Sequence, residues 1–295
     1  PGYILPFPDI DHIANALRKI LGPKAGHAIA RWKNIRLYTG MYRISQRYPQ
    51  LVRKIIRKLQ ESRLPADFDF DTHLTPRYNP WDQRMCLVPN GDFFKAISSG
   101  KASIVTDHID RLTETGVRLK SGRELEADII VSATGFDMKP LGGITLSVDG
   151  EVKPIGQRIS FRGMMLSDIP NFSYVIGYST NSWTLKSDLV AEHVCRILTM
   201  LDENGASACA PRPPEALQTK PFAPNFRPGY IDRSVHLFPK QGDRAPWQSP
   251  VIYDEDVREM KHMPVANRDL QLLYSSEETD RSASANPRSS EVAAR

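Results

Sequence analysis

A short continuous apolar run, Ile129-Ile130-Val131, follows Asp128 and leads into Ala133-Thr134-Gly135. A short run of this kind is typical of a strand that is covered on both faces of a sheet. Small residues at the carboxyl end of such a strand let a backbone or a flat ligand approach closely, as in open α/β sheets. The pattern equally fits an ordinary core strand whose glycine only permits a turn.

Helical periodicity marks the first 63 residues. The apolar side chains predicted to share a helical face are Ile13, Leu17, Ile20 and Leu21 before a stop at Gly22-Pro23, and Leu51, Ile55 and Leu59 after Pro49. Ile29, Trp32 and Ile35 mark a less regular helix between these two stretches. The sequence therefore predicts a helical module near its start.

A second helical pattern covers residues 183–201, and Asn181 or Ser182 is placed to cap its start. The predicted buried side of this helix consists of Val190, Val194, Ile197, Leu198 and Leu201. Strands are predicted at 103–105, 117–119, 128–132 and 172–176, with a hairpin turn at Ser121-Gly122. The prolines and aromatic residues of 68–94 predict an ordered loop.

Several motifs follow one another in a characteristic order along the chain. The blocks are ATGF at 133–136, FRGMMLSDIPNF at 161–172, IGY at 176–178, SWTLKSDLVAEHVCRIL at 182–198 and RSVHLFPKQGDRAPW at 233–247. In this order they resemble the carboxyl-terminal half of the class B flavoprotein monooxygenases, within the Baeyer-Villiger branch. The resemblance runs from about Pro1 to Tyr253.

The resemblance implies an α/β fold, as a fragment of a flavoprotein that has two dinucleotide-binding domains and a helical insertion. Residues 1–136 would be the remainder of the NADPH-binding domain, with the basic helical insertion at 10–63, and residues 137–205 the returning part of the FAD-binding domain. A proline-rich carboxyl-terminal arm at 206–265 and a disordered tail at 266–295 would follow. FAD and NADPH are the implied cofactors, with O2 and a small-molecule ketone or sulfur compound as substrates.

Three motifs of that family do not occur in the sequence, namely its two Gly-x-Gly-x-x-Gly loops and its Phe-x-Gly-x-x-x-His-x-x-x-Trp fingerprint. The chain also begins with Pro1 and not Met. We therefore expect a piece of a longer protein whose amino-terminal half is missing, and we expect this chain alone to lack activity. The alternative is a non-catalytic remnant or a partner-dependent fragment. A disulfide-type pyridine-nucleotide reductase is disfavoured because no redox cysteine pair is present.

Arg84 is the predicted catalytic residue. In the resembling family an arginine of the matching loop lies against the flavin and the nicotinamide, where its fixed cation can stabilise negative charge as it forms. Gln83 precedes it here, whereas better-known members carry Lys at that position. The alternative is a surface arginine paired with Asp82.

The resemblance further predicts a set of cofactor-binding residues: Gln83, Thr134, Gly135, Tyr178, Asn181 and Trp183. A helix that starts near residue 183 offers unpaired amides and a positive dipole end, which suit the anionic ring of a reduced flavin. The alternative is a capped helix and nothing more. The scattered histidines predict no metal site.

Composition excludes several classes of protein. The 295 residues are 40% apolar and 25% charged, which suits one large or two ordinary domains. No stretch approaches the roughly eighteen apolar residues of a membrane span, and no signal peptide opens the sequence. The cysteines at positions 86, 195 and 209 have neither metal spacing nor the even count of a disulfide framework. These features predict a cytoplasmic setting.

Charge is concentrated in residues 11–63, where 13 Lys and Arg face only Asp11 and Glu61, a local charge of +11 in a chain of net charge +5. This basic face fits a solvated surface, a guide for the NADPH phosphate, or an anchor to anionic lipid or nucleic acid. Nucleic acid is disfavoured because no zinc, helix-turn-helix or RNA-binding signature accompanies the charge. A peripheral membrane contact through these basic helices stays open.

Overall fold

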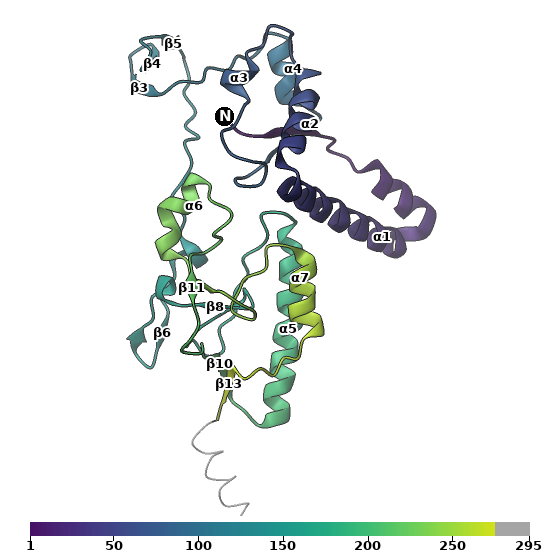
Figure 1. The fold of residues 1–295 in the computed structure, drawn as a ribbon, viewed down its shortest axis with the longest axis vertical. Helices are drawn as coiled ribbons and strands as arrows, with labels where there is room; N and C mark the ends of the chain where they lie inside the picture. The colour runs from purple at the N-terminus through teal and green to yellow at the C-terminus, as the bar shows by residue number, and fades with distance from the viewer. Residues whose placement is uncertain (275–295) are drawn as a thin grey trace, which may run out of the picture. The chain divides into compact units, whose positions relative to one another are not determined.

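The computed structural model describes residues 1–274 and divides the chain into two compact units. Unit 1 comprises residues 1–137 together with 226–230, and unit 2 comprises 138–225 together with the residues from 231 on. Helices and strands are mixed along both units (Figure 1), which confirms the predicted α/β class. The return of residues 226–230 to unit 1 has no counterpart in the sequence prediction.

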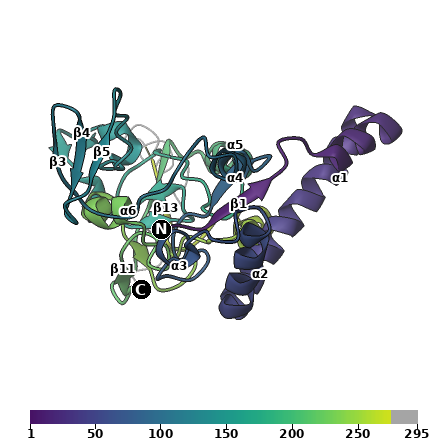
Figure 2. The ribbon, with the colours of Figure 1, turned by 90° about the horizontal axis from the view of Figure 1, so that it is seen from above.

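The first helix of unit 1, α1 (His12–Arg47), is divided at Gly22, whose φ of 78° and ψ of 166° interrupt the helical backbone. Figure 2 shows α1 bent near its amino-terminal end. The two segments pack closely, because an ideal Cβ at Gly26 would lie 2.5 Å from the Cα of Arg18. Asp11 caps the start by accepting a hydrogen bond of 3.0 Å from the amide of Ala14, and its other oxygen lies 2.7 Å from Nζ of Lys33. The predicted stop at Gly22-Pro23 is therefore a tight bend.

Helix α2 (Pro49–Glu61) packs on strand β1 (Ile4–Phe7), which pairs in parallel with strand β2 (Cys86–Pro89). The side face of α2 that meets β1 carries Ile56 and Gln60, whose Nε2 donates a 2.7 Å hydrogen bond to the carbonyl of Ile4. Of the three residues predicted to share a helical face, Leu51 and Ile55 are exposed, whereas Leu59 packs against the buried cluster around Ile56. Helix α2 has apolar residues on two faces, and the contact with β1 determines which of the two faces is buried.

Residues 68–94 were predicted as a loop, and this was only partly right. They contain α3 (Phe70–His73), strand β2 and the start of α4 (Asp92–Ser98). The buried side chains of Phe70, Leu74 and Phe94 hold these short elements together as one cluster. The aromatic residues that suggested an ordered loop therefore form a small core.

A separate three-stranded antiparallel sheet is formed by β3 (Ile109–Leu112), β4 (Gly116–Leu119) and β5 (Glu124–Glu126). The predicted strand at 117–119 lies in β4, and the predicted strand at 103–105 is not formed. The predicted buried strand at 128–132 is wrong as well, since Ile129 is 82% exposed and Val131 is 84% exposed. Among residues 1–274 no strand pairs with this segment, and an unpaired extended segment has no ladder to hold it.

Unit 2 is built around helix α5 (Trp183–Asn204), beside which lie α7 (Tyr253–Val257) and the single π turn Arg258–His262 (Figure 1). The predicted helix from 183 to 201 is confirmed and is three residues longer. Leu198, which we predicted to be buried, is exposed. Val190, Ile197 and Leu201 are buried as predicted, and Leu189 and His193 are buried beside them.

The remaining elements of unit 2 are short. They are β6 (Ser147–Val148), β7 (Glu151–Val152), β8 (Ser160–Phe161), β9 (Met165–Leu166), β10 (Ala208–Pro211), β11 (Thr219–Lys220), β12 (Gln241–Gly242) and β13 (Leu270–Leu273). Helix α6 (Gly229–Ser234) begins in unit 1 and ends in unit 2. The predicted strand at 172–176 is reduced to one bridge, between Ser173 and Met165.

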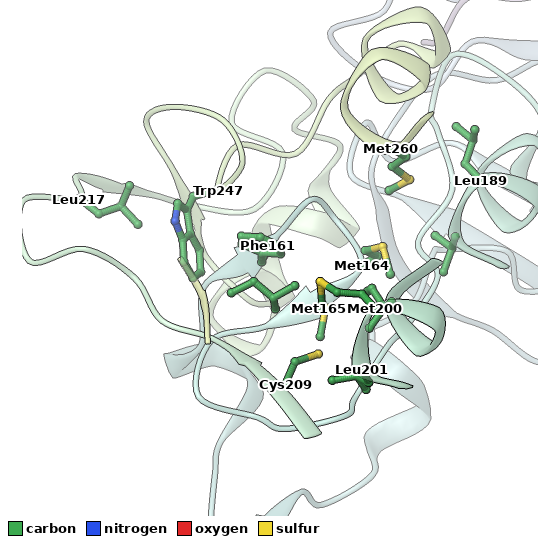
Figure 3. Close-up of a cluster of buried hydrophobic side chains, with 13 residues drawn as sticks. Phe161, Met164, Met165, Leu189, Met200, Leu201, Cys209, Leu217, Trp247 and Met260 are labelled. Atoms are coloured by element: carbon green, nitrogen blue, oxygen red, sulfur yellow. The ribbon is translucent and has the colours of Figure 1, made fainter. Parts of the chain in front are cut away.

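The main core of unit 2 draws on segments that are far apart in the sequence (Figure 3). Met164 and Met165 from the β8–β9 turn meet Met200 of α5, while Cys209 and Trp247 come from the proline-rich region. The indole nitrogen of Trp247 donates a 2.8 Å hydrogen bond to Asp269. The arm predicted at 206–265 thus contributes buried side chains to the core of the unit.

The boundary of the predicted tail needs a correction. Residues 270–273 form β13, which pairs with β10, so the segment 266–274 is ordered. The rest of the predicted tail lies outside the described residues. Across residues 1–274, no helix combines the length and the apolar character that a bilayer crossing requires.

Candidate cofactor site

The predicted site residues fall into two groups, one in each unit. Gln83, Arg84, Thr134 and Gly135 belong to unit 1, whereas Tyr178, Asn181 and Trp183 belong to unit 2. Each group is therefore built from its own unit.

Arg84 is exposed and lies just before β2, between the half-buried Gln83 and the buried Met85. Met85 belongs to a cluster with Tyr3, Leu5 and Ile56, and Trp81 packs against the same cluster, so the backbone is anchored on both sides of the arginine. The carboxylate of Asp82 accepts a 2.9 Å hydrogen bond from the amide of Asn79. Among the contacts described for residues 1–274, none joins Arg84 to Asp82. Arg84 is thus an exposed cation on a backbone segment that packing holds in place.

Three separate parts of unit 1 meet near Arg84. The carbonyl of Asp82 accepts a 3.1 Å hydrogen bond from the amide of Arg227, which docks residues 226–230 on this loop. The ring of Tyr230 lies 5.1 Å from the ring of Phe136, centroid to centroid. Burial raises the pKa of Tyr230, and the nearby charge of Arg84 acts in the opposite direction. Arg84, Phe136 and Tyr230 therefore form one neighbourhood.

Thr134 and Gly135 immediately precede Phe136 and are exposed. Gly135 has a φ of 94°, a backbone conformation that L side chains rarely adopt. The aromatic contact between Phe136 and Tyr230 fixes the end of this segment. The predicted cofactor residues Thr134 and Gly135 are thus brought next to the neighbourhood of Arg84.

In unit 2 the predicted residues surround the start of α5. Ser182 occupies the N-cap position, as one of the two predicted alternatives, but its side chain makes no capping hydrogen bond. Its Oγ lies 2.8 Å from Oγ1 of Thr184 instead. The side chain of Asn181 contacts Thr180, with 3.5 Å between Nδ2 and Oγ1. The first turn of α5 therefore keeps amides that no side chain caps.

Trp183 opens α5 with a half-exposed indole ring. The ring lies directly over Gly177, where an ideal Cβ would stand 2.2 Å from Cγ of Trp183. No side chain fits in that space, so this glycine permits the close approach of the ring to the backbone. The geometry presents one flat face of an aromatic residue beside an open helix start.

Tyr178 points away from this start and into the unit. Its side chain is buried, its hydroxyl donates a short hydrogen bond to Asp256, and its ring meets the edge of Tyr253 at 6.3 Å. Burial raises the pKa of Tyr178 well above its usual value, and the charge of Asp256 adds to this. The hydroxyl of Tyr178 is therefore used inside unit 2.

Asp256 also binds Lys186, with 2.8 Å between Nζ and Oδ2. Both side chains are buried, at 4% and 0% exposure. Burial lowers the pKa of Lys186 and raises the pKa of Asp256, while the attraction between the two charges opposes both shifts. Oδ1 of Asp256 is buried without a hydrogen-bond partner among the described residues.

A second buried polar pair lies close to the first. Nη1 of Arg162 lies 2.9 Å from Nε2 of His193, and Nδ1 of His193 lies 2.8 Å from the carbonyl of Met260. Since the carbonyl can only accept, Nδ1 carries the proton and Nε2 accepts from the guanidinium. Burial, followed by the charge of Arg162, lowers the pKa of His193 to about 4. This histidine is therefore neutral near pH 7.

The sequence prediction missed Lys186, Asp256 and Tyr230. Lys186 carried a signal, because it precedes Val190 by four residues and so lies on the predicted buried face of α5. A charge at such a position requires a buried partner. Asp256 and Tyr230 carried no local signal, because both contacts join segments that are distant in the sequence. No group of three His, Cys, Asp or Glu suited to a metal ion gathers within residues 1–274.

Comparison with curated proteins gives long matches. The chain is 44% identical over 273 residues to "FAD-containing monooxygenase EthA" of Mycobacterium tuberculosis strain H37Rv, which is 92% of this chain and 56% of that protein. It is 41% identical over 281 residues to "Probable FAD-binding monooxygenase AlmA" of Acinetobacter baylyi, which is 95% of this chain and 56% of that protein. The chain thus spans about half the length of the curated relatives it matches.

Comparison with solved structures supports the same fold. A crystal structure of OTEMO in complex with FAD and NADP aligns with a TM-score of 0.54 at 15% identity, covering 76% of this chain and 45% of that one. Oxidised steroid monooxygenase bound to NADP aligns with a TM-score of 0.53 at 16% identity, covering 77% of this chain and 46% of that one. No protein-family model matches the chain.

The fold is therefore that of flavoprotein monooxygenases. By sequence, the chain is a relative of the FAD-containing monooxygenases and corresponds to a carboxyl-terminal portion of them. The resemblance predicted from the ordered motifs is confirmed.

Proposed function

We propose that this chain is the carboxyl-terminal part of an FAD- and NADPH-dependent monooxygenase that oxygenates ketones, in the Baeyer-Villiger manner, or sulfur compounds. The observation that carries the proposal is the 44% identity over 92% of the chain to a protein named as an FAD-containing monooxygenase. Two structural neighbours are complexes with NADP, which supports NADPH as the nicotinamide cofactor.

The residues of this chain fit the ring end of a flavin better than its phosphates. The start of α5 offers uncapped amides beside the half-exposed ring of Trp183, and such a helix start suits an anionic ring. No Gly-x-Gly-x-x-Gly loop is present in the sequence to hold a pyrophosphate. We therefore assign phosphate binding to the portion of the relatives that this chain does not match.

In this proposal Arg84 is the catalytic residue of the chain. FAD supplies the electron transfer from NADPH to O2, and the guanidinium of Arg84 provides a fixed positive charge beside that chemistry. The exposure of Arg84 and the anchoring of its neighbour Met85 support this role. Because a guanidinium stays charged at every working pH, it can stabilise negative charge without giving up a proton.

The other roles follow the same division. Gln83, Thr134 and Gly135 would border the cofactors next to Arg84, and Asn181 and Trp183 would border the flavin ring at the start of α5. Tyr178 would contact the flavin only through its ring, since its hydroxyl is bound to Asp256. We place the protein in the cytoplasm and its basic helical insertion at an anionic surface.

The alternative function is a non-catalytic remnant or a fragment that needs a partner chain. The exposed apolar side chains of Ile129 and Val131 favour it, because a surface of this kind is usually covered. Purification of the chain alone separates the options. A yellow protein with about one FAD per chain would contradict the hypothesis of a non-catalytic remnant. A colourless protein would exclude the hypothesis that this chain is an enzyme by itself.

The proposed function itself is tested in a chimera in which this chain replaces the matching portion of EthA from Mycobacterium tuberculosis. The chimera restores the half of the relative that the chain does not match. We expect it to bind FAD and to oxidise NADPH. A folded chimera without flavin would contradict the proposal, and so would an upstream reading frame of this gene that ends in a stop codon.

A further inference from the structure

The helices of the insertion carry almost only positive charge, since Glu61 at the end of α2 is their one acidic residue. Residues 12–60 include 12 Lys and Arg and no Asp or Glu. These residues make up most of α1 and α2. A surface of this composition attracts an extended negative partner, and the attraction weakens as salt rises.

The long segment of α1, residues 23–47, exposes apolar side chains as well. Ile29 is 42% exposed, Trp32 61%, Leu37 46% and Ile44 53%. With about 100° of rotation per residue, these four positions fall within an arc of about 140° on the helix. The buried residues Ala30, Thr39 and Ser45 lie outside this arc, whereas the buried Gly26 lies within it and packs against the first segment of α1. The arc is therefore covered at Gly26 and open along Trp32, Leu37 and Ile44.

The open side is also basic. Arg36, Arg43 and Arg47 fall within the same arc as the four apolar residues, and each is exposed. The short first segment of α1 adds Ile13 and Ile20, which are seven residues apart on one face and exposed. We call the residues Ile29, Trp32, Arg36, Leu37, Arg43, Ile44 and Arg47 the open face of α1.

Both properties of the open face match the surface of an anionic lipid bilayer. A bilayer interface accepts Trp, Ile and Leu among its acyl chains while its anionic headgroups bind arginines, and a helix of this pattern lies flat in the interface. A second copy of the chain would set arginine against arginine, which repels. Nucleic acid would use the charge but leave the four apolar side chains in water.

We propose that the open face of α1 docks on the surface of an anionic lipid bilayer. This deepens the proposed placement of the insertion at an anionic surface, and it does not depend on flavin chemistry. The segment is long enough to lie along the interface for about 37 Å, at about 1.5 Å per residue. Within residues 1–274 no helix is suited to cross the bilayer, so the contact would be peripheral.

The first test is cosedimentation of the chain with vesicles of phosphatidylcholine alone and of phosphatidylcholine with about one third phosphatidylglycerol. We expect binding only to the anionic vesicles, and a loss of about tenfold when the salt rises from about 0.05 M to about 0.3 M. Binding to both kinds of vesicle with no dependence on salt would overturn the proposal.

Variants then place the contact on the open face. Ile29→Ser with Trp32→Ser should weaken binding to the anionic vesicles at least tenfold, because the apolar anchor is lost. The matched control is Ile109→Ser with Leu112→Ser, two exposed apolar residues of β3, which should leave binding unchanged. Arg47→Gln should weaken binding to the anionic vesicles about fivefold. Lys120→Gln, outside the insertion, should leave this binding unchanged.

Two outcomes would contradict the assignment. If the variant Ile29→Ser with Trp32→Ser bound the anionic vesicles as well as the wild-type chain, at equal helical content, the open face would not be the membrane contact. Concentration-dependent self-association that the same variants abolish, without any binding to vesicles, would make this face a contact between copies. FAD content and NADPH oxidation of the chimera are measured separately, so failure of the membrane contact is distinct from failure of the enzyme.

Discussion

The ammonium of Lys186 and the carboxylate of Asp256 form a buried ion pair at 2.8 Å that ties helix α5 to helix α7. The same carboxylate accepts a hydrogen bond from the hydroxyl of Tyr178, a residue that lies just before the start of α5. One carboxylate thus joins three segments of unit 2. The position of the helix start at Trp183 depends on this connection.

Removal of one partner of this pair should destabilise unit 2 strongly. Lys186→Met leaves a buried carboxylate without its cation, which typically costs about 3–5 kcal/mol. The double variant Lys186→Met with Asp256→Leu should recover much of this loss, because no uncompensated charge remains. Amide hydrogen exchange of α5 measures the opening free energy of this unit.

The ion pair between the half-buried Lys153 and the exposed Glu151, 2.6 Å apart, serves as the control. Glu151→Gln should change the opening free energy by less than about 1 kcal/mol. The single variant Asp256→Leu completes the cycle. If the stability losses of the two single variants simply added up in the double variant, the two side chains would not act as a coupled pair.

Unit 2 should lose stability in mild acid through His193. The pKa of His193 is lowered to about 4 from 6.5 in the folded state, so the unfolded chain binds more protons between these values. Stability is therefore fully present above pH 6.5 and falls as the pH decreases toward 4, by about 3 kcal/mol at most. Urea unfolding at a series of pH values measures this slope.

His193→Gln removes the titrating group and should flatten the stability profile between pH 4 and 6.5. His262→Gln, at an exposed histidine, is the matched control and should leave the slope as it is. A slope that survives His193→Gln would assign the acid sensitivity to other groups.

Gly177→Ala should displace the ring of Trp183, because the new Cβ would stand 2.2 Å from Cγ of the indole. In the chimera we expect a loss of FAD content and a shift in tryptophan fluorescence, since the ring would leave its place beside the start of α5. Gly40→Ala is the control, as nothing lies within 4 Å of that Cβ. Unchanged flavin content in the Gly177 variant would remove Trp183 from the proposed site.

Arg84→Ala in the chimera should lower the rate of substrate oxygenation by about 100-fold or more while FAD stays bound, because a fixed charge beside the reaction is lost. Arg84→Lys should recover only part of the rate, since an ammonium lacks the planar fork of a guanidinium. Arg77→Ala, at another exposed arginine of the same region, serves as the control. Oxygenation at the original rate in Arg84→Ala would exclude the catalytic role.

Local patterns predicted some of these features well. Helix α5 follows from its own periodicity, and the ordered motifs identified the family of relatives because several blocks agreed in sequence order. The segment at 128–132 was predicted as a buried strand and is exposed, because a strand depends on neighbours that local pattern does not specify. Helix α2 has apolar residues on two faces, so its buried face depended on the contact with β1.

The candidate site was predictable only in part. Arg84 and Trp183 were found through their motifs, whereas the contact between Tyr230 and Phe136 joins residues 94 positions apart and leaves no trace in either local sequence. Lys186 could have been recognised as a charge on a buried helical face. Its partner Asp256 becomes evident only when α7 is packed beside α5.

The most direct test of the account is the amount of FAD that the chimera binds, measured together with NADPH-dependent consumption of O2. We predict about one FAD per chain in the chimera, O2 consumption that requires NADPH, and no bound flavin in the chain alone. A chimera that folds but remains colourless, or that binds FAD and never consumes O2 with NADPH, would contradict the assignment of this chain to a functional flavin monooxygenase.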